Sequence, residues 1–222
     1  MEIALFSVLI LGIVWFSYYA IHCKGTDRPA LGDIRAILDP RGWKQMLYYI
    51  LVPVSCVAVM LMLHLYYGRD AMFITKHLLV MGMLWPVAVF DYREYRIPNK
   101  LLLVFLGIRA GLLIPELLFF GADGLAAVLF ELIAAVGCTV VCVVSMLISR
   151  GSLGMGDLKL MAVMAFFLGI EGVCYAMFLS VFAAFVCSVG LLITKKKGRK
   201  DAIPFAPFIL IGTIVSFILC GT

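Results

Sequence analysis

The chain alternates long apolar runs with short polar segments, and most runs are long enough for membrane-spanning helices. A helix needs about 20 apolar residues to cross the hydrocarbon core of a bilayer. The runs predict helices at 3–21, 45–66, 74–90, 99–120, 125–148, 158–170, 172–193 and 203–220. The run at 158–170 is short for a full crossing. This pattern predicts an all-α, polytopic membrane protein with about eight transmembrane helices in a single domain over residues 1–222.

The amino-acid composition supports this placement in lipid. Hydrophobic residues make up 64% of the chain and charged residues 14%, whereas soluble domains are about 45–50% apolar and about 25% charged. A water-soluble surface cannot be built from so few polar residues. Membrane lipid is therefore the expected surrounding, and the net charge of +5 fits basic loops that attract anionic lipid. The sequence has no basic and aromatic patch of the kind that binds nucleic acid.

The basic residues give the expected orientation, because Lys and Arg collect in short cytoplasmic loops. With eight spans and the N-terminus outside, fifteen of the 18 Lys and Arg residues fall on the cytoplasmic side. Residues 1–44 then form a retained signal-anchor helix and a basic cytoplasmic loop, since Glu2 stands where a cleaved signal peptide would carry basic residues. Residues 45–222 form the main helix bundle.

Two aspartates lie at the ends of apolar runs and are the strongest candidates for function. A carboxylate beside hydrocarbon costs on the order of 3 kcal/mol at mid-helix, so one that is kept there suggests a function. Two predicted spans separate Asp91 from Asp157, which places both at the cytoplasmic face. Alternatively, Asp91 is a solvated acid at a helix end, and Asp157 is a first-turn acid that stabilises its own helix.

The residues around the aspartates favour the functional interpretation. Gly151, Gly154 and Gly156 precede Asp157 and suggest a close backbone approach or a positive φ beside the acid. After Asp91, Pro98 presets the first turn of the next helix. Pro204 and Pro207 begin the last run, where they predict either an ordinary helix start or an extended edge that lines a cavity. The seven cysteines and three histidines show no metal-ligand spacing, so we expect no metal and no cofactor.

Three segments together resemble the type IV prepilin peptidase family, the bacterial members of the GxGD intramembrane aspartyl proteases. They are Phe90-Asp91 with Ile97-Pro98-Asn99, then Gly154-Met155-Gly156-Asp157-Leu158-Lys159-Leu160, then Ile203-Pro204-Phe205-Ala206-Pro207 with Gly212. The resemblance implies that Asp91 and Asp157 are the catalytic pair, and that Pro98, Asn99, Gly154, Gly156, Pro204 and Pro207 shape the site. Its implied substrates and partners are prepilins or pseudopilins, cut on the cytoplasmic side of the bacterial inner membrane before an apolar helix.

The chain departs from the family in two places. Residues 23–44 hold one cysteine, Cys23, where long members carry a zinc-binding cysteine insert, so the family's N-methyltransferase activity is not expected. Ala206 replaces a usual glycine, which matters only if that position needs a positive φ.

The expected mechanism is hydrolysis by water, with two close carboxyl groups that share a proton. A proton-coupled transporter with paired acids is the alternative, but it predicts internal repeats, and the sequence shows no convincing one. Presenilin-like proteases are expected to carry Tyr where Phe90 stands.

Overall fold

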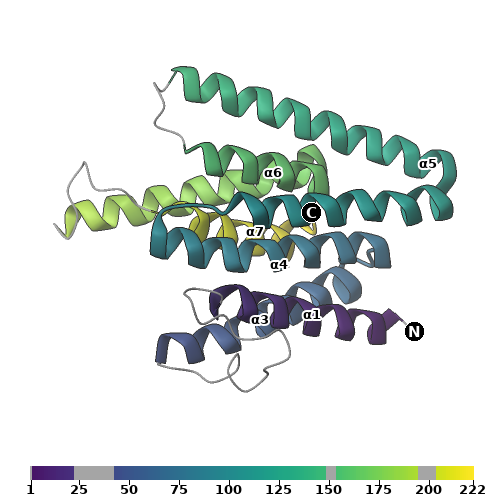
Figure 1. Ribbon diagram of the computed structural model, residues 1–222, viewed down its shortest axis with the longest axis horizontal. Coiled ribbons are helices and arrows are strands. Elements are labelled where there is room, and N and C mark those ends of the chain that lie inside the picture. The colour runs from purple at the N-terminus through teal and green to yellow at the C-terminus, as the bar shows by residue number, and fades with distance from the viewer. Residues whose placement is uncertain (1, 23–42, 149–153, 195–203) are drawn as a thin grey trace.

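All regular elements of the computed structural model are helices within the residues that it describes, which are 2–22, 43–148, 154–194 and 204–222. The helices are α1 (Glu2–His22), α3 (Trp43–Leu61), which continues as the π-helical turn η1 (Met62–Tyr66), α4 (Ala71–Glu94), α5 (Asn99–Ile148), α6 (Met155–Ile193) and α7 (Ala206–Cys220). The all-α prediction is confirmed for these residues. The helices run roughly parallel or antiparallel to one another along the long axis of the molecule (Figure 1).

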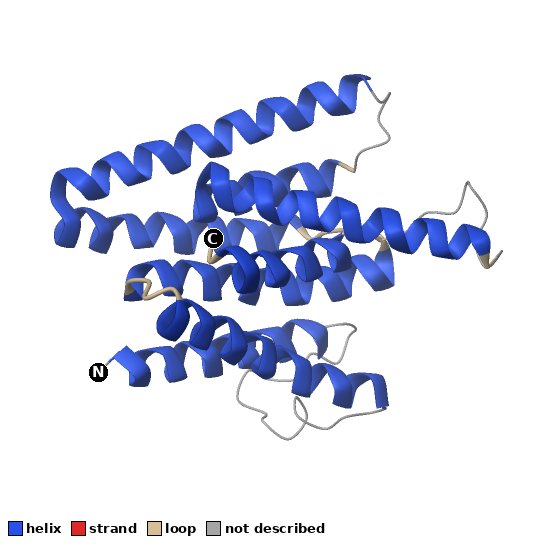
Figure 2. Ribbon diagram, turned by 180° about the vertical axis from the view of Figure 1, so that it is seen from behind, coloured by secondary structure: helices blue, strands red, loops and turns tan. Residues whose placement is uncertain are grey.

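Helices α5 and α6 are each folded back on themselves at a glycine. Gly121 in α5 has φ 55° and ψ −123°, and Gly169 in α6 has φ 71° and ψ −173°. An L-residue with a side chain rarely adopts such angles, so glycine is needed at both turns. Each helix therefore forms two antiparallel legs, visible from both sides of the molecule (Figures 1 and 2). These folds explain why the sequence shows two apolar runs in each of the two helices.

Three helices of the described chain are long and apolar enough to cross a membrane: α4, α5 and α6 as far as Leu191. They differ in burial, since 72% of the apolar window of α4 is buried in the molecule but only 11% of that of α5. Helix α4 thus forms the centre of the bundle, and α5 presents its leucines, valines and phenylalanines outward. An exposed apolar surface of this extent is typical of a protein embedded in lipid.

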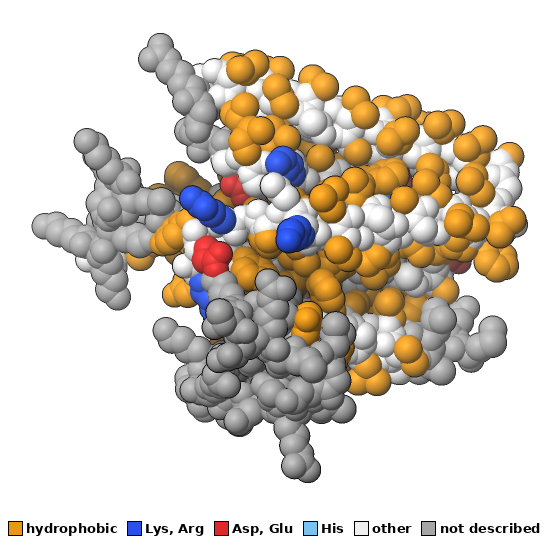
Figure 3. Space-filling model, viewed as in Figure 1, with side chains coloured by type: hydrophobic (Ala, Val, Ile, Leu, Met, Phe, Trp, Pro, Cys, Tyr) orange, Lys and Arg blue, Asp and Glu red, His pale blue; other side chains and the backbone are white. Residues whose placement is uncertain are grey.

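The end of α4 and the beginnings of α5, α6 and α7 lie at one end of the molecule (Figure 1). On the face seen in Figure 3, the Lys and Arg side chains gather at this same end. The turns at Gly121 and Gly169 and the C-terminus lie toward the opposite end. The described residues thus bring the end of α4 and the beginnings of α5, α6 and α7 to the same end of the bundle.

Helix α7 is held near its middle and at its C-terminal end. Near its middle, Gly212 packs against Ser180 of α6 so closely that a Cβ on Gly212 would lie 2.7 Å from the Ser180 Cα. At its C-terminal end, the Tyr67 hydroxyl donates a hydrogen bond of 2.7 Å to the Leu219 carbonyl, and Arg69 donates one of 3.0 Å to the Gly221 carbonyl. These donors satisfy carbonyls that have no partner within the helix.

A buried cluster of four charges joins three helices away from the two aspartates. Arg109 is fully buried and donates to Glu116 at 2.9 Å, to Glu131 and to the Phe166 carbonyl at 2.9 Å. Lys76 of α4 lies 3.2 Å from Glu116 and also pairs with Glu131. The two acids and two bases balance one another, which removes most of the cost of burying them. The cluster ties the two legs of α5 to α4 and α6.

The Gly212 contact predicts a sharp difference between two Gly→Ala substitutions. Gly212→Ala should lower the thermal unfolding midpoint in detergent, because overpacking of this kind costs about 1–3 kcal/mol. Gly111→Ala is the matched control, since a Cβ there would meet no atom within 4 Å. Its midpoint should be unchanged or slightly higher, as alanine favours helix by up to about 1 kcal/mol. Equal midpoints for the two variants would contradict this packing.

Candidate active site

Asp91 lies in the last turn of α4 and is buried. Its Oδ2 accepts a hydrogen bond of 2.9 Å from the backbone N–H of Ala206, the first residue of α7. A helix N-terminus carries partial positive charge and free N–H donors, so it is a favourable partner for a carboxylate. The structure therefore excludes the alternative in which Asp91 is a solvated acid at a helix end.

The segment after Asp91 turns sharply and returns toward α6. Tyr95 ends α4 with φ 53° and ψ 34°, and its N–H donates to the Asp91 carbonyl at 2.9 Å. Among the described residues other than glycine, Tyr95 alone has a positive φ. Such a backbone costs about 1–3 kcal/mol and is kept where the surroundings determine it, often beside functional groups. Pro98 follows directly before α5, and its carbonyl accepts from the Leu101 N–H at 3.1 Å.

Asp157 lies in the first turn of α6 and is half-buried. Its carboxylate folds back toward the start of the helix, because a Cβ on Gly154 would lie 3.0 Å from the Asp157 Oδ2. A Cβ on Gly156 would lie 3.1 Å from the Ile97 Cβ. Neither glycine has a positive φ. Close approach is thus the reason for these two glycines, and Gly151 lies outside the described residues.

The segment before α7 is a helix start and not an extended edge. Pro204 precedes the helix, and Phe205 has φ −93° and ψ −30°, in the right-handed helical region. The carbonyl of Phe205 accepts from the N–H groups of Phe208 and Ile209. The prediction of a strand-like edge is wrong for the described part of this segment. Pro207 lies in the first turn of α7, where the missing N–H of proline has no helical partner to lose.

Ala206 is fully buried and has a negative φ. Alanine therefore fits where the resembling family usually has glycine, since the position does not require positive φ. The group that Ala206 contributes to the site is its backbone N–H, which any residue except proline provides.

Asp91, at the end of α4, accepts a hydrogen bond from the N-terminus of α7, and Asp157 lies in the first turn of α6. The charge of Asp91 acts on the carboxyl of Asp157. Neither carboxylate forms an ion pair with another described residue, in contrast to the buried cluster around Arg109. The Lys159 amine donates instead to the Asn99 amide oxygen at 3.1 Å. Two carboxyl groups left close together without a cation favour a state in which they share one proton.

Several of the residues singled out from the sequence are in contact with one another. Direct contacts join Asp91 to Ala206, Ile97 to Gly156, Gly154 to Asp157, and Asn99 to Lys159. Pro98, Pro204 and Pro207 lie next to these contacts in the chain and are half-buried. The sequence did not single out the Ala206 N–H, and it overlooked the charges at Lys76, Arg109, Glu116 and Glu131. The sequence did contain a signal for that cluster, because a charged residue within an apolar run costs free energy unless it is paired.

Comparison with known proteins supports the family resemblance that the motifs suggest. Residues 78–189, half of the chain, match the type IV leader peptidase family, and this range includes Asp91 and Asp157. A prepilin leader peptidase/N-methyltransferase from Bacillus subtilis (strain 168) is 32% identical over 132 residues, which is 60% of this chain and 50% of that protein. The chain thus spans about half the length of the curated relative that it matches. No solved structure matches the chain significantly.

The contact between Ile97 and Gly156 predicts a disulfide in an engineered pair. On a background without the native cysteines, Ile97→Cys with Gly156→Cys should cross-link under mild oxidation. The two Cβ atoms would lie 3.1 Å apart, so a shift of about half an ångström brings them into the disulfide range of about 3.5–4.5 Å. Mass spectrometry of peptides without reduction would detect the bond. Ile97→Cys with Gly154→Cys is the control, since a Cβ at residue 154 meets only Asp157 within 4 Å. Equal cross-linking in both pairs would contradict the packing.

Proposed function

We propose that this chain, which belongs to the type IV leader peptidase family, is an aspartyl endopeptidase that removes the basic leader of prepilins or pseudopilins. The observation that carries the proposal is that buried Asp91 accepts a hydrogen bond from the start of α7, while Asp157 lies at the start of α6 within reach of the Asp91 charge. Two carboxyl groups in this relation are suited to acid–base hydrolysis of a peptide bond.

In the proposed reaction, one carboxylate takes a proton from a water molecule as the water attacks the scissile carbonyl carbon. The other carboxyl group, which holds the shared proton, donates a hydrogen bond to the carbonyl oxygen. Collapse of the tetrahedral intermediate breaks the C–N bond, and a proton passes to the leaving amine. The carboxyl pair returns to its singly protonated state, so the reaction consumes only water.

The surroundings suggest different roles for the two acids. Asp91 accepts the Ala206 N–H at the N-terminus of α7, and both features stabilise a carboxylate. We assign Asp91 as the ionised group that activates water, and Asp157 as the group that carries the proton. Ala206 is then a positioning residue, because its N–H holds Asp91 in place without touching the substrate.

The proposal includes the orientation in the membrane. We count about eight spans, with each leg of α5 and α6 as one, and the end of α4 and the starts of α6 and α7 then lie at one end of the bundle (Figure 1). The positive-inside rule then places the dyad at the cytoplasmic face of the bacterial inner membrane. A basic leader would reach the dyad from the cytoplasm, while the apolar helix that follows it stays in lipid.

We limit the proposal to cleavage. The name of the Bacillus subtilis relative also includes N-methyltransferase, but residues 23–44 of this chain hold a single cysteine, Cys23. Zinc and a methyl donor are not needed for the hydrolysis described above. A proton-coupled transporter is not favoured, because the family match points to a peptidase.

Replacement of either aspartate should abolish cleavage. Asp91→Asn and Asp157→Asn should each lower the cleavage rate by about 10⁴-fold, and the double variant should be no worse, because groups that act as a unit are not additive. The assay is cleavage of a prepilin-like peptide by purified protein in detergent. Asp123→Asn is the control, since Asp123 is an exposed acid on the second leg of α5. Near wild-type cleavage by either dyad variant would remove that residue from the mechanism.

The contact at Ala206 predicts opposite outcomes for a smaller and a larger side chain. Ala206→Gly keeps the N–H and should cleave within about twofold of the wild-type rate. Ala206→Leu must fit a larger side chain into a fully buried position, which costs about 1–3 kcal/mol by overpacking and displaces the N–H from Asp91. Its cleavage rate should fall at least about tenfold. Cleavage by Ala206→Leu at the rate of Ala206→Gly would show that the hydrogen bond does not matter.

A further inference from the structure

Three sulfur-bearing side chains meet where the second leg of α5 packs on the first leg of α6. The Cys142 sulfur of α5 lies 3.3 Å from the Met161 sulfur of α6. Cys138 precedes Cys142 by one helical turn and so lies on the same face of α5, and its side chain interacts with that of Cys142. We call Cys138, Cys142 and Met161 the sulfur cluster.

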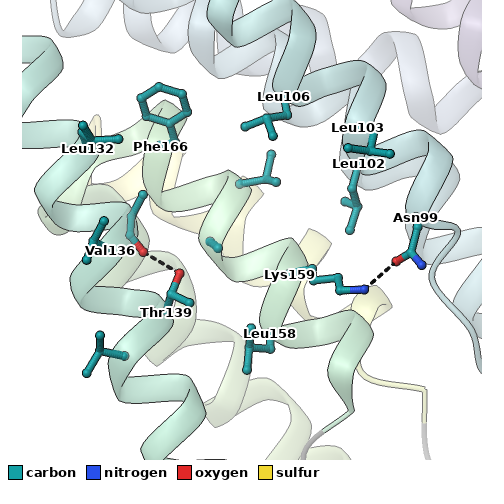
Figure 4. Close-up of a pocket in the computed structure, with 14 residues that line it drawn as sticks. Asn99, Leu102, Leu103, Leu106, Leu132, Val136, Thr139, Leu158, Lys159 and Phe166 are labelled. Atoms are coloured by element: carbon teal, nitrogen blue, oxygen red, sulfur yellow. Dashed lines mark hydrogen bonds between the residues drawn. The ribbon is translucent and has the colours of Figure 1, made fainter.

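The surroundings of the sulfur cluster are apolar. Thr139 and Leu158, which line an apolar groove, mark the two helical legs in Figure 4. Leu158 also packs against the two buried members of the cluster. Phe205 and Met177 pack against the same side chains, so the second leg of α6 and the start of α7 help to enclose them.

Two members of the cluster are buried and one is partly exposed. The exposed fractions of Cys142 and Met161 are 7% and 8%, whereas Cys138 is half-buried. An apolar shell around a metal site limits the access of solvent. A ligand can therefore reach the cluster at Cys138 and be held against the two buried sulfur atoms.

The donor atoms decide which ligand chemistry fits the cluster. Thiolates and thioethers are soft donors that select Cu⁺ among the biological metals. No three His, Cys, Asp or Glu side chains converge in the part of the chain that the structure describes, so the pair of thiols does not belong to a zinc site of four such ligands. The third donor is a thioether, and it comes from another helix, 19 residues from Cys142. The spacing of cysteines and histidines in the sequence therefore did not reveal this set.

The observed geometry needs only a small adjustment to hold one metal ion. Two sulfur atoms that bind one ion at about 2.3 Å, with about 120° between the bonds, lie about 4 Å apart. The sulfur atoms of Cys142 and Met161 would thus separate by about 0.7 Å from their present 3.3 Å. The three rotatable bonds of the methionine side chain allow a movement of this size.

We propose that the sulfur cluster binds one Cu⁺ ion, with two thiolates and one thioether as its ligands. Both thiols lose their protons to the medium on binding, and neither copper nor sulfur changes its oxidation state. The bound ion links the second leg of α5 to the first leg of α6, four residues after Asp157. This inference does not depend on the proposed function, because no step of the hydrolysis uses these three side chains.

The first test measures Cu⁺ affinity in a chain that keeps only the two cluster thiols. In this background, alanine replaces the other five cysteines, which are Cys23, Cys56, Cys174, Cys187 and Cys220. The protein in detergent is titrated with Cu⁺ without oxygen, in competition with a coloured Cu⁺ chelator. It should bind one Cu⁺ per chain. Cys138→Ser and Cys142→Ser should each lower the affinity at least about 100-fold, because changes beyond the ligands themselves already cost about 10–100-fold.

Two methionines on the same leg of α6 separate metal binding from packing. Met161→Leu nearly conserves volume and should lower the Cu⁺ affinity at least about tenfold, since it removes one ligand. Met164→Leu is the matched control, because Met164 is fully buried in the main core and outside the sulfur cluster. X-ray absorption should show three sulfur neighbours of copper in the background and in Met164→Leu, and two in Met161→Leu. Equal affinities of the two methionine variants would overturn the proposal.

The second test uses the chain with its native cysteines and measures thermal unfolding in detergent. Cu⁺ should raise the unfolding midpoint of this chain, because a ligand that binds the folded state stabilises it. The double variant Cys138→Ser/Cys142→Ser should have the same midpoint without metal, show a smaller rise with Cu⁺ and bind one Cu⁺ fewer. An equal rise and equal binding in the double variant would overturn the proposal. A rise with Zn²⁺ as large as that with Cu⁺ in the native chain would overturn the assignment to a soft ion.

Discussion

The hydrogen bond from the Ala206 N–H to Asp91 is the contact on which the arrangement of the site depends. It joins the end of α4 to the start of α7 across 115 residues of sequence. It also provides a buried carboxylate with a donor, without which burial would cost several kcal/mol. Helix α7 can present this donor because Gly212 lets it lie against Ser180, and because Tyr67 and Arg69 hold its other end. The position of one acid therefore depends on the packing of the whole of α7.

Buried charged side chains of this protein occur in two different settings, one paired and one unpaired. Around Arg109, two acids and two bases pair with one another, and this neutral cluster fixes the legs of α5 against α4 and α6. At the proposed site, neither Asp91 nor Asp157 has a cation as a partner among the described residues; Asp91 bonds to the N-terminus of α7 and Asp157 lies at the N-terminus of α6. Paired charges give a rigid scaffold, whereas unpaired acids keep a proton available for transfer. The paired cluster therefore supports the fold, and under the proposed function the two unpaired aspartates carry out the chemistry.

The scaffold and the site are also connected in space. The Arg109 guanidinium of the cluster lies over the Phe166 ring, and Asp157 lies nine residues before Phe166 in α6. Phe166 and Asp157 both lie on the first leg of α6, which precedes the turn at Gly169.

The sequence by itself predicted an all-helical chain and the family, and it singled out the two aspartates as candidates, because apolar periodicity and short motifs are local properties of the chain. The resemblance to prepilin peptidases is confirmed by the family match over residues 78–189. Sequence reasoning left the environment of Asp91 open between solvated and buried, and it favoured close approach or positive φ equally for Gly154 and Gly156. It also considered an extended edge before α7, where Phe205 is helical. Tertiary structure decided these points, because the N–H that meets Asp91, the side chain that meets Gly156 and the partners of Arg109 all come from other helices. Which groups meet across a bundle is set by the packing of helices distant in sequence, and a local pattern does not contain that information.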